Sequence, residues 1–278
     1  MSLPSFPLLK RRTISMLVFA AFTPHTPLLV PAVGQDGLAK LHGTAEAMKR
    51  LSDELYAARP ETIVLLSSHG TEFPEAFSVN LHDEYEAGLA EFGDLSDPRT
   101  FAPDLPFIDA LQRGMRRQGV AVTLDSDAKL DHGAAVPLLV LTKPLADVRI
   151  VPISFSGLSA KEHVAFGRGL KDVVLHSSRR IAVIASGDLS HALSSNAPAG
   201  YRPEGEEFDG IVRQAIEHMA TSQLLSLSPA TVSAAAECAY RPLLMLFGLL
   251  EGMKVRPEML GYESPFGVGY LTVQFHLA

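Results

Sequence analysis

The 278-residue sequence contains a single cysteine, Cys238, so no disulfide bond can form within the chain. This cysteine usage is typical of proteins in a reducing compartment, and we expect the protein to be cytoplasmic. No stretch of the sequence approaches the ~20 consecutive apolar residues that a membrane-spanning helix needs. We therefore expect no membrane partner.

Basic residues are also scarce. The chain has 24 lysines and arginines against 31 aspartates and glutamates, which gives a formal net charge of −7. A surface of this sign repels phosphate groups, and the basic clusters are short: residues 10–12, 116–117 and 179–180. We therefore expect no nucleic-acid partner.

Several common catalytic motifs are absent. The sequence has no Gly-x-Ser-x-Gly nucleophile motif, no phosphate-binding P-loop, and no Gly-x-Gly-x-x-Gly after the first apolar run. Asp188, Ser190 and His191 are too close in sequence to favour a serine triad. Cys238 precedes an apolar helix, where a small buried side chain is a simpler interpretation than a nucleophile.

Apolar runs typical of strands alternate with amphipathic helical segments. The predicted strands are residues 17–22, 62–67, 75–80, 120–124, 149–153, 181–185, 254–262 and 268–275. The predicted helices are residues 38–58, 104–118, 134–141, 159–175, 204–219 and 239–250, and residues 83–102 are predicted as a loop. This alternation favours an α/β fold with three layers (α/β/α), a mostly parallel central sheet and an antiparallel C-terminal strand pair.

We find no linker, repeat or low-complexity tract, so a single domain over residues 16–278 is the simplest organisation. Residues 1–15 are predicted to be an N-terminal extension, with Met16 as the natural start. The final strand is expected to be an uncovered edge that pairs across a homodimer.

Histidines and acidic residues stand where predicted strands end and helices begin. His25 follows the first strand, His69 the second, and His191 the strand at 181–185, while His132 and Glu237 precede apolar helices. Because the carboxyl ends of parallel strands meet at one edge of a sheet, we expect these side chains to share one polar site.

Imidazole and carboxylate groups together indicate a metal site. Two histidines and one carboxylate on one face of an octahedral ion form the site of non-haem Fe(II) oxygenases. Zinc is the alternative that the residue types leave open. Histidines beyond the ligand set are suited to proton transfer, because the pKa of imidazole lies near neutrality.

Six motifs in the same order carry a resemblance to a known family. The segments PHTPLLVP, SSHG, DHGAAVPLL, SGDLSHAL, ECAYRPLL and YESPFGVGYL resemble the class III extradiol ring-cleavage dioxygenase (LigB-like) superfamily. The set is most similar to the stand-alone branch called AmmeMemoRadiSam system protein B, or Memo-like. The resemblance covers residues 17–276, essentially the whole predicted domain.

The resemblance implies a role for each candidate residue. It implies that His25, His69 and Glu237 hold Fe(II), with Zn²⁺ as the alternative metal in the purified protein. It assigns acid–base catalysis to His191 and a further active-site position to His132. We expect Asp188 to orient His191 or a neighbouring backbone group.

The activity implied by the resemblance is Fe(II)-dependent extradiol cleavage of a catechol-type aromatic by O₂, so the expected partners are a small aromatic diol and O₂. Two alternatives stay open: a Memo-like metal-binding regulatory protein without dioxygenase activity, and a zinc hydrolase on the same scaffold. Memo-like proteins have a cysteine near the position of Glu237, and here Cys238 is its neighbour. We favour Glu237 as the third ligand; Cys238 in that role would favour softer metals and a loss of dioxygenase chemistry.

Overall fold

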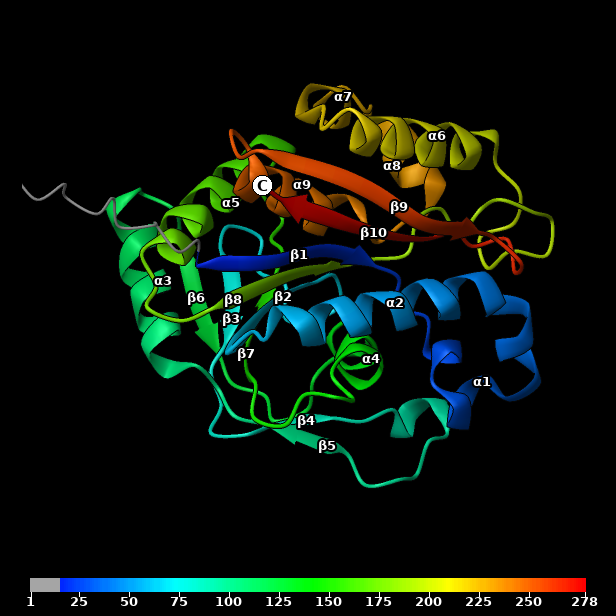
Figure 1. The fold of residues 1–278 in the computed structure, drawn as a ribbon. Coiled ribbons are helices and arrows are strands. Elements are labelled where there is room, and N and C mark those ends of the chain that lie inside the picture. The colour runs from blue at the N-terminus through cyan, green and yellow to red at the C-terminus, as the bar shows by residue number, and fades with distance from the viewer. Residues whose placement is uncertain (1–15) are drawn as a thin grey trace, which may run out of the picture.

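An eight-stranded mixed sheet lies at the centre of the computed structural model, which describes residues 16–278 (Figure 1). The strand order is β6-β3-β7-β2-β8-β1-β10-β9. The strands are β1 (Leu17–Thr23), β2 (Thr62–Ser67), β3 (Phe77–Asn80), β6 (Val122–Asp125), β7 (Arg149–Ser154), β8 (Ile181–Ser186), β9 (Val255–Glu263) and β10 (Tyr270–Leu277). The predicted extension at residues 1–15 lies outside the described residues.

The four central strands, β7, β2, β8 and β1, are parallel neighbours. Every residue of β2 and β8 is buried, which explains why their sequences are continuous apolar runs rather than alternating ones. Because these strands are parallel, their carboxyl ends lie at the same edge of the sheet. The predicted α/β fold with a mostly parallel sheet is confirmed.

The outer strands change direction. At one end β10 is antiparallel to both β1 and β9, as predicted for the C-terminal pair. At the other end β3 is antiparallel to β7, while β6 is parallel to β3. The final strand, β10, therefore lies between two neighbours, and β9 forms the edge. The expectation that the final strand is an uncovered edge is wrong.

Residues 83–102, predicted as a loop, also contain regular structure. Two short strands, β4 (Tyr85–Ala87) and β5 (Arg99–Phe101), pair antiparallel in a separate two-stranded sheet. Three-residue strands leave no alternation that a sequence pattern can reveal, so the loop prediction is wrong for these residues.

Helices cover both faces of the large sheet (Figure 1). One face carries α1 (Pro31–Leu38), α2 (His42–Ala58) and α4 (His132–Leu141). The other carries α3 (Leu105–Arg117), α5 (Ala160–Leu175), α6 (Pro203–Glu217), α7 (Thr221–Leu225), α8 (Pro229–Ala235) and α9 (Tyr240–Leu250). Within residues 16–278, no helix has both the length and the apolar character needed to cross a bilayer.

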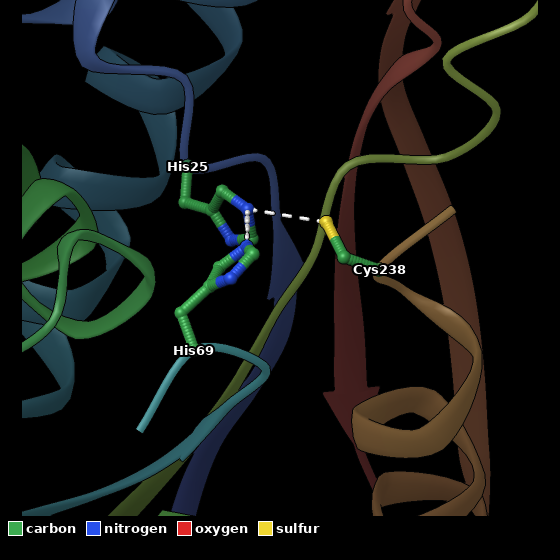
Figure 2. A group of neighbouring side chains, drawn as sticks. All are labelled: His25, His69 and Cys238. Atoms are coloured by element: carbon green, nitrogen blue, oxygen red, sulfur yellow. Dashed lines mark hydrogen bonds between the residues drawn. The ribbon is translucent and has the colours of Figure 1, made fainter. Parts of the chain in front are cut away.

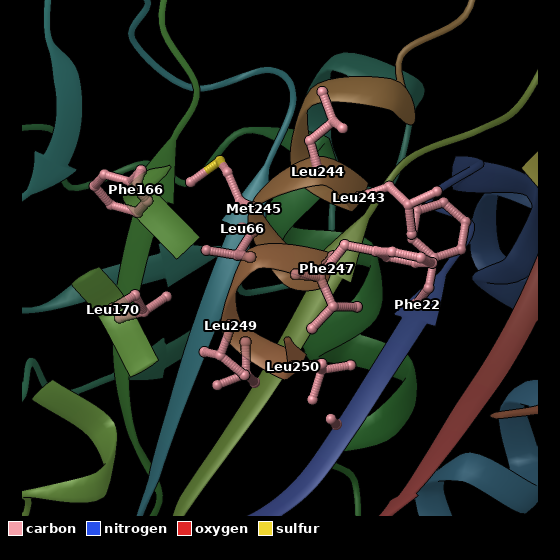
Figure 3. Close-up of a cluster of buried hydrophobic side chains, with 14 of the residues drawn as sticks. Phe22, Leu66, Phe166, Leu170, Leu243, Leu244, Met245, Phe247, Leu249 and Leu250 are labelled. Atoms are coloured by element: carbon pink, nitrogen blue, oxygen red, sulfur yellow. The ribbon is translucent and has the colours of Figure 1, made fainter. Parts of the chain in front are cut away.

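Helix α9 is the most deeply buried helix of the second face. All of its residues except Arg241 are buried, and its leucines and Phe247 pack against the sheet and α5 (Figure 3). The backbones of α5 and α9 approach closely, because a Cβ atom on Gly167 would lie 2.0 Å from the carbonyl oxygen of Met245. This packing fixes the position at which α9 begins, two residues after Cys238.

Candidate metal centre

His25 lies in the turn that follows β1 and is almost fully buried. Its backbone N–H donates to Oδ1 of Asp188 at 3.0 Å, and its Nδ1 atom lies 3.0 Å from Oγ of Ser186. Both partners come from the end of β8, the parallel neighbour of β1. With Nδ1 held by Ser186, the other ring nitrogen, Nε2, is left to face the centre of the site.

His69 follows β2 and completes a histidine pair. Its Nε2 atom lies 3.2 Å from Nε2 of His25. The backbone N–H of His69 donates to Oγ of Ser67 at 3.3 Å, and the Ser67 hydroxyl in turn donates to Asp131. The two ring nitrogens thus point at each other from the ends of two strands, as the strand-end argument predicts.

The third donor is the thiol of Cys238. Its Sγ atom lies 3.3 Å from Nε2 of His25, and the ligand atoms of His25, His69 and Cys238 all lie within 4.8 Å of one another (Figure 2). Asp188 fixes the thiol through its backbone: its N–H points at Sγ at 3.3 Å, and its carbonyl accepts from the N–H of Cys238 at 3.1 Å. Two imidazoles and one thiol therefore face a common point.

Two further predicted residues, His132 and His191, stand beside this group. His132 is the first residue of α4, and its ring stacks on His69 with ring centroids 4.2 Å apart. His191 is held by its backbone N–H on the carbonyl of Ala235, and its Nδ1 atom is buried without a hydrogen-bond partner among residues 16–278. The rings of His25, His69 and His132 thus contact one another, and His191 is near enough for its charge to lower the pKa values of His25 and His69.

Burial keeps the histidine donors neutral. Burial lowers the pKa of His25 well below its usual value, and the neighbouring histidines lower it further. Burial, followed by the charges of His132 and His191, lowers the pKa of His69 to about 4. Neutral imidazole is the form that binds metals. Burial raises the pKa of the Cys238 thiol, so metal binding there must displace a proton.

Glu237, the predicted carboxylate ligand, is not part of the three-residue group. Its Oε2 atom accepts a hydrogen bond of 2.6 Å from the backbone N–H of Tyr240, the first residue of α9. Burial raises the pKa of this carboxyl to about 7. The assignment of Glu237 as a ligand stays a prediction, but this geometry favours Cys238.

Asp188 contacts a backbone group, one of the two orienting roles expected of it. Its carboxylate accepts from the backbone N–H of His25, and its Oδ2 atom lies 4.0 Å from Nε2 of that residue. Burial raises its pKa to about 7. Asp188 therefore orients the segments of His25 and Cys238 through backbone contacts, and not His191, the other residue expected. Ser186 was missed, because a serine at the end of a strand carries no distinctive signal.

Two cavities adjoin the group, and His69 lies in the wall of both. The first, of about 840 Å³, includes Cys238 and Glu237 in its wall and is mainly apolar. The second, of about 800 Å³, includes His132 and several carboxylates. Both are large enough for an organic molecule to reach the donors.

Comparisons with known proteins place the chain in a family. Residues 19–273 match the family model described as the catalytic LigB subunit of aromatic ring-opening dioxygenase. The chain is 33% identical over 256 residues to Protein CA_C1420 of Clostridium acetobutylicum, covering 89% of the chain and 55% of that protein. It is 26% identical over 176 residues to 4,5-DOPA dioxygenase extradiol of Beta vulgaris, covering 59% of the chain and 62% of that protein.

The chain thus spans between half and two thirds of the length of these relatives. A crystal structure of the uncharacterized protein JW3007 from Escherichia coli K12 shares the fold, with a TM-score of 0.62 and 22% identity, over 92% of this chain and 99% of that chain. Because the family model matches nearly all of the described residues, the chain belongs to the family of the catalytic LigB subunit of aromatic ring-opening dioxygenases.

Proposed function

We propose that the protein is a metal-dependent oxidoreductase that opens the ring of a small aromatic diol with O₂. The observation that carries this proposal is the convergence of three histidines, His25, His69 and His132, whose ring centroids lie 4.2–5.2 Å apart, so that two can hold a metal and one is left beside them. Membership of the family and the distant relative named as a dioxygenase support the reaction class.

The donors fit a divalent metal ion. The Nε2 atoms of His25 and His69 face each other at 3.2 Å, and the lowered pKa values of both rings favour the neutral form. A cation bound between the two rings would accept a lone pair from each nitrogen. His25 Nε2, His69 Nε2 and Cys238 Sγ would hold the ion. When bound, it would supply open coordination positions at which a diol and O₂ are brought together. Fe(II) is the metal that the family implies.

The remaining residues would handle protons and position the substrate. The imidazole of His191 would accept a proton from a diol hydroxyl and later return it, since burial lowers the pKa of this histidine and favours its neutral form. His132, stacked on His69, would donate a hydrogen bond to an oxygen of the substrate. The apolar cavity wall would exclude water from the reacting end.

A second candidate is a Memo-like metal-binding regulatory protein without ring cleavage. The position of Cys238 favours it, because a thiolate in place of a carboxylate suits softer ions such as zinc or Cu(I). A zinc hydrolase on the same scaffold belongs to this group of alternatives. The cytoplasmic location and the homodimer stay predictions.

Oxygen uptake separates these candidates. Protein purified without oxygen and loaded with Fe(II) should consume O₂ with at least one member of a catechol panel. H191Q should lower the rate by 10²–10⁴-fold, the usual contribution of an acid–base group. The control H176Q changes an exposed histidine that hydrogen-bonds within its own helix, and should leave the rate unchanged. Fe(II) binding without O₂ consumption would favour the regulatory protein, and hydrolysis with Zn²⁺ alone would favour the hydrolase.

A further inference from the structure

The cavity of about 840 Å³ gives a bound molecule access to two of the three donors. Cys238 and His69 both lie in its wall, and Figure 2 shows each directed toward His25, Cys238 from the segment before α9 and His69 from the loop after β2. Most of the remaining wall is apolar and includes Phe155, Leu227 and Val232. A single aromatic ring fills only a small part of this volume, which lies in the range for drug-sized ligands.

Two cations lie in the same wall. Lys161 is exposed in the first turn of α5, and no hydrogen bond or ion pair engages it within residues 16–278. The guanidinium of Arg241 lies 4.8 Å from the ring centroid of Phe155 and binds Glu72 through Nη1 at 3.1 Å. Its other N–H groups stay available, because a guanidinium carries five donors.

Acidic groups near the cavity have partners of their own. Glu72 pairs with Arg241, Glu162 accepts from the backbone N–H of Ser159, and Glu237 accepts from the backbone N–H of Tyr240. The positive end of the α5 dipole adds to the charge of Lys161 at the same place. In the wall itself two cations, Lys161 and Arg241, stand against a single carboxyl, Glu237, so this cavity accommodates an anion more readily than one lined mainly by carboxylates.

The second cavity beside His69 has the opposite charge. Its wall combines one lysine with five carboxylates: Lys129 against Glu86, Glu91, Asp125, Asp127 and Asp131. An anionic molecule that approaches the donors is repelled from this side and attracted to the side of Lys161. The difference in charge between the two cavities therefore favours a negatively charged ligand in the cavity that contains Lys161, and disfavours the same ligand in the cavity that contains Lys129.

We propose that the cavity beside Cys238 binds an organic anion with an apolar body larger than one ring, its anionic group held by Lys161 and Arg241. The chemical class is an aromatic or apolar molecule that ends in a carboxylate or sulfonate. The inference rests on the proposed function only in assigning the reacting diol to the other end of this molecule, next to His69 and Cys238.

Binding of 8-anilinonaphthalene-1-sulfonate to the full-length, metal-free protein tests this site. This probe has an apolar two-ring body, an anilino ring and one sulfonate, and its uncharged counterpart is N-phenyl-1-naphthylamine. We expect binding of one sulfonate probe per chain by titration calorimetry, at least tenfold tighter than the uncharged compound. K161E should weaken binding of the sulfonate at least tenfold and leave the uncharged compound unaffected, and the effect should shrink at high salt.

Two further variants locate the site. K129E makes the same change of charge in the other cavity and should leave the dissociation constant of the sulfonate unchanged. V232W places a large ring in the wall of the proposed cavity and should weaken binding of both compounds. Thermal melts of each variant check the fold, and K161Q provides a milder change at the same exposed position.

Several results overturn the proposal. These are equal affinity for the charged and uncharged compounds, wild-type affinity in both K161E and K161Q, an equal loss in K129E, or no binding at all. The assay needs neither metal nor O₂, so its failure leaves the proposed ring cleavage standing. A protein that binds the sulfonate but consumes no O₂ with any diol retains the anion site and loses the proposed function.

Discussion

Two of the three donors of the candidate metal centre are held by neighbouring residues that are not themselves donors. Ser186 holds Nδ1 of His25, and the backbone of Asp188 holds the thiol of Cys238. Both neighbours belong to the segment at the end of β8, which thus positions two of the three donors. Such supporting contacts orient the donor atoms and fix which ring nitrogen is free.

The contact between Ser186 and His25 gives the first prediction. S186A removes the group that holds Nδ1, so the ring can rotate or change tautomer, and we expect the affinity for Zn²⁺ to fall 10–100-fold. Competition with a chelating dye measures this affinity. The control S226A changes a hydroxyl that only binds the carbonyl of Gln223 in its own turn, and should bind Zn²⁺ like the wild type. Unchanged affinity in S186A would show that this contact does not support the site.

The histidines of the site were predictable, but the third donor was not. His25, His69 and His191 follow strands, and the ends of parallel strands meet wherever the sheet forms. Ala236, the residue before Glu237 and Cys238, adopts a left-handed conformation (φ 51°, ψ 42°) between α8 and α9. Alanine rarely occurs in this region, so no sequence signal reveals which of the next two side chains faces the histidines.

At the scale of secondary-structure elements, the contact between α5 and α9 fixes one wall of the site. The two helices touch at Gly167 and Gly248, where added Cβ atoms would lie 2.0 Å from the carbonyl oxygen of Met245 and 2.1 Å from that of Val164. Backbone atoms cannot move aside as flexible side chains do. The close approach places the start of α9, and with it Cys238, against the end of β8.

The glycine contact gives the second prediction. G167A should lower the free energy of unfolding by about 1–3 kcal/mol or more, because the methyl group forces the two helices apart. The control is G210A in α6, where an added Cβ meets nothing within 4 Å; it should be neutral or stabilise by up to about 1 kcal/mol. Urea unfolding compares the two. A stability of G167A equal to that of G210A would show that the helices adjust without cost.

The long elements were predictable and the short ones were not. Helix α5 begins at the capping box of Ser159 and Glu162 that the sequence shows, and the central strands lie where their apolar runs do. The strands β4 and β5 have three residues each, and their pairing depends on contacts far apart in the sequence. Likewise, the reversed direction of β3 beside β7 comes from tertiary packing.

At the scale of the whole molecule, a buried carboxyl couples stability to pH. Asp209 of α6 accepts from the backbone N–H of Ser190 at 2.8 Å and from the hydroxyl of Tyr262 in β9 at 2.7 Å. Burial raises its pKa from 3.8 to about 6. A raised pKa means that the folded protein holds this proton more tightly than the unfolded chain does. The stabilisation is complete below about pH 4 and is lost as the pH rises to about 6.

This coupling gives the third prediction. D209N cannot titrate, so its stability relative to the wild type should increase by about 2 kcal/mol between pH 4 and pH 7, since one pKa unit corresponds to about 1.4 kcal/mol and part of the change falls below pH 4. Buried histidines with lowered pKa values change stability in the opposite direction, but they are common to both proteins and cancel. Urea unfolding at several pH values measures the difference. A difference that does not vary with pH would contradict the assignment.

The most direct test of the account is the absorption spectrum of the protein loaded with Co²⁺, which binds the same nitrogen and sulfur donors as zinc. Coordination by Cys238 produces a thiolate-to-cobalt charge-transfer band in the near ultraviolet. The account predicts this band in the wild type and in E237Q, and its loss in C238S. A spectrum without the band in the wild type, or a loss of bound cobalt in E237Q but not in C238S, would contradict a metal centre built from His25, His69 and Cys238.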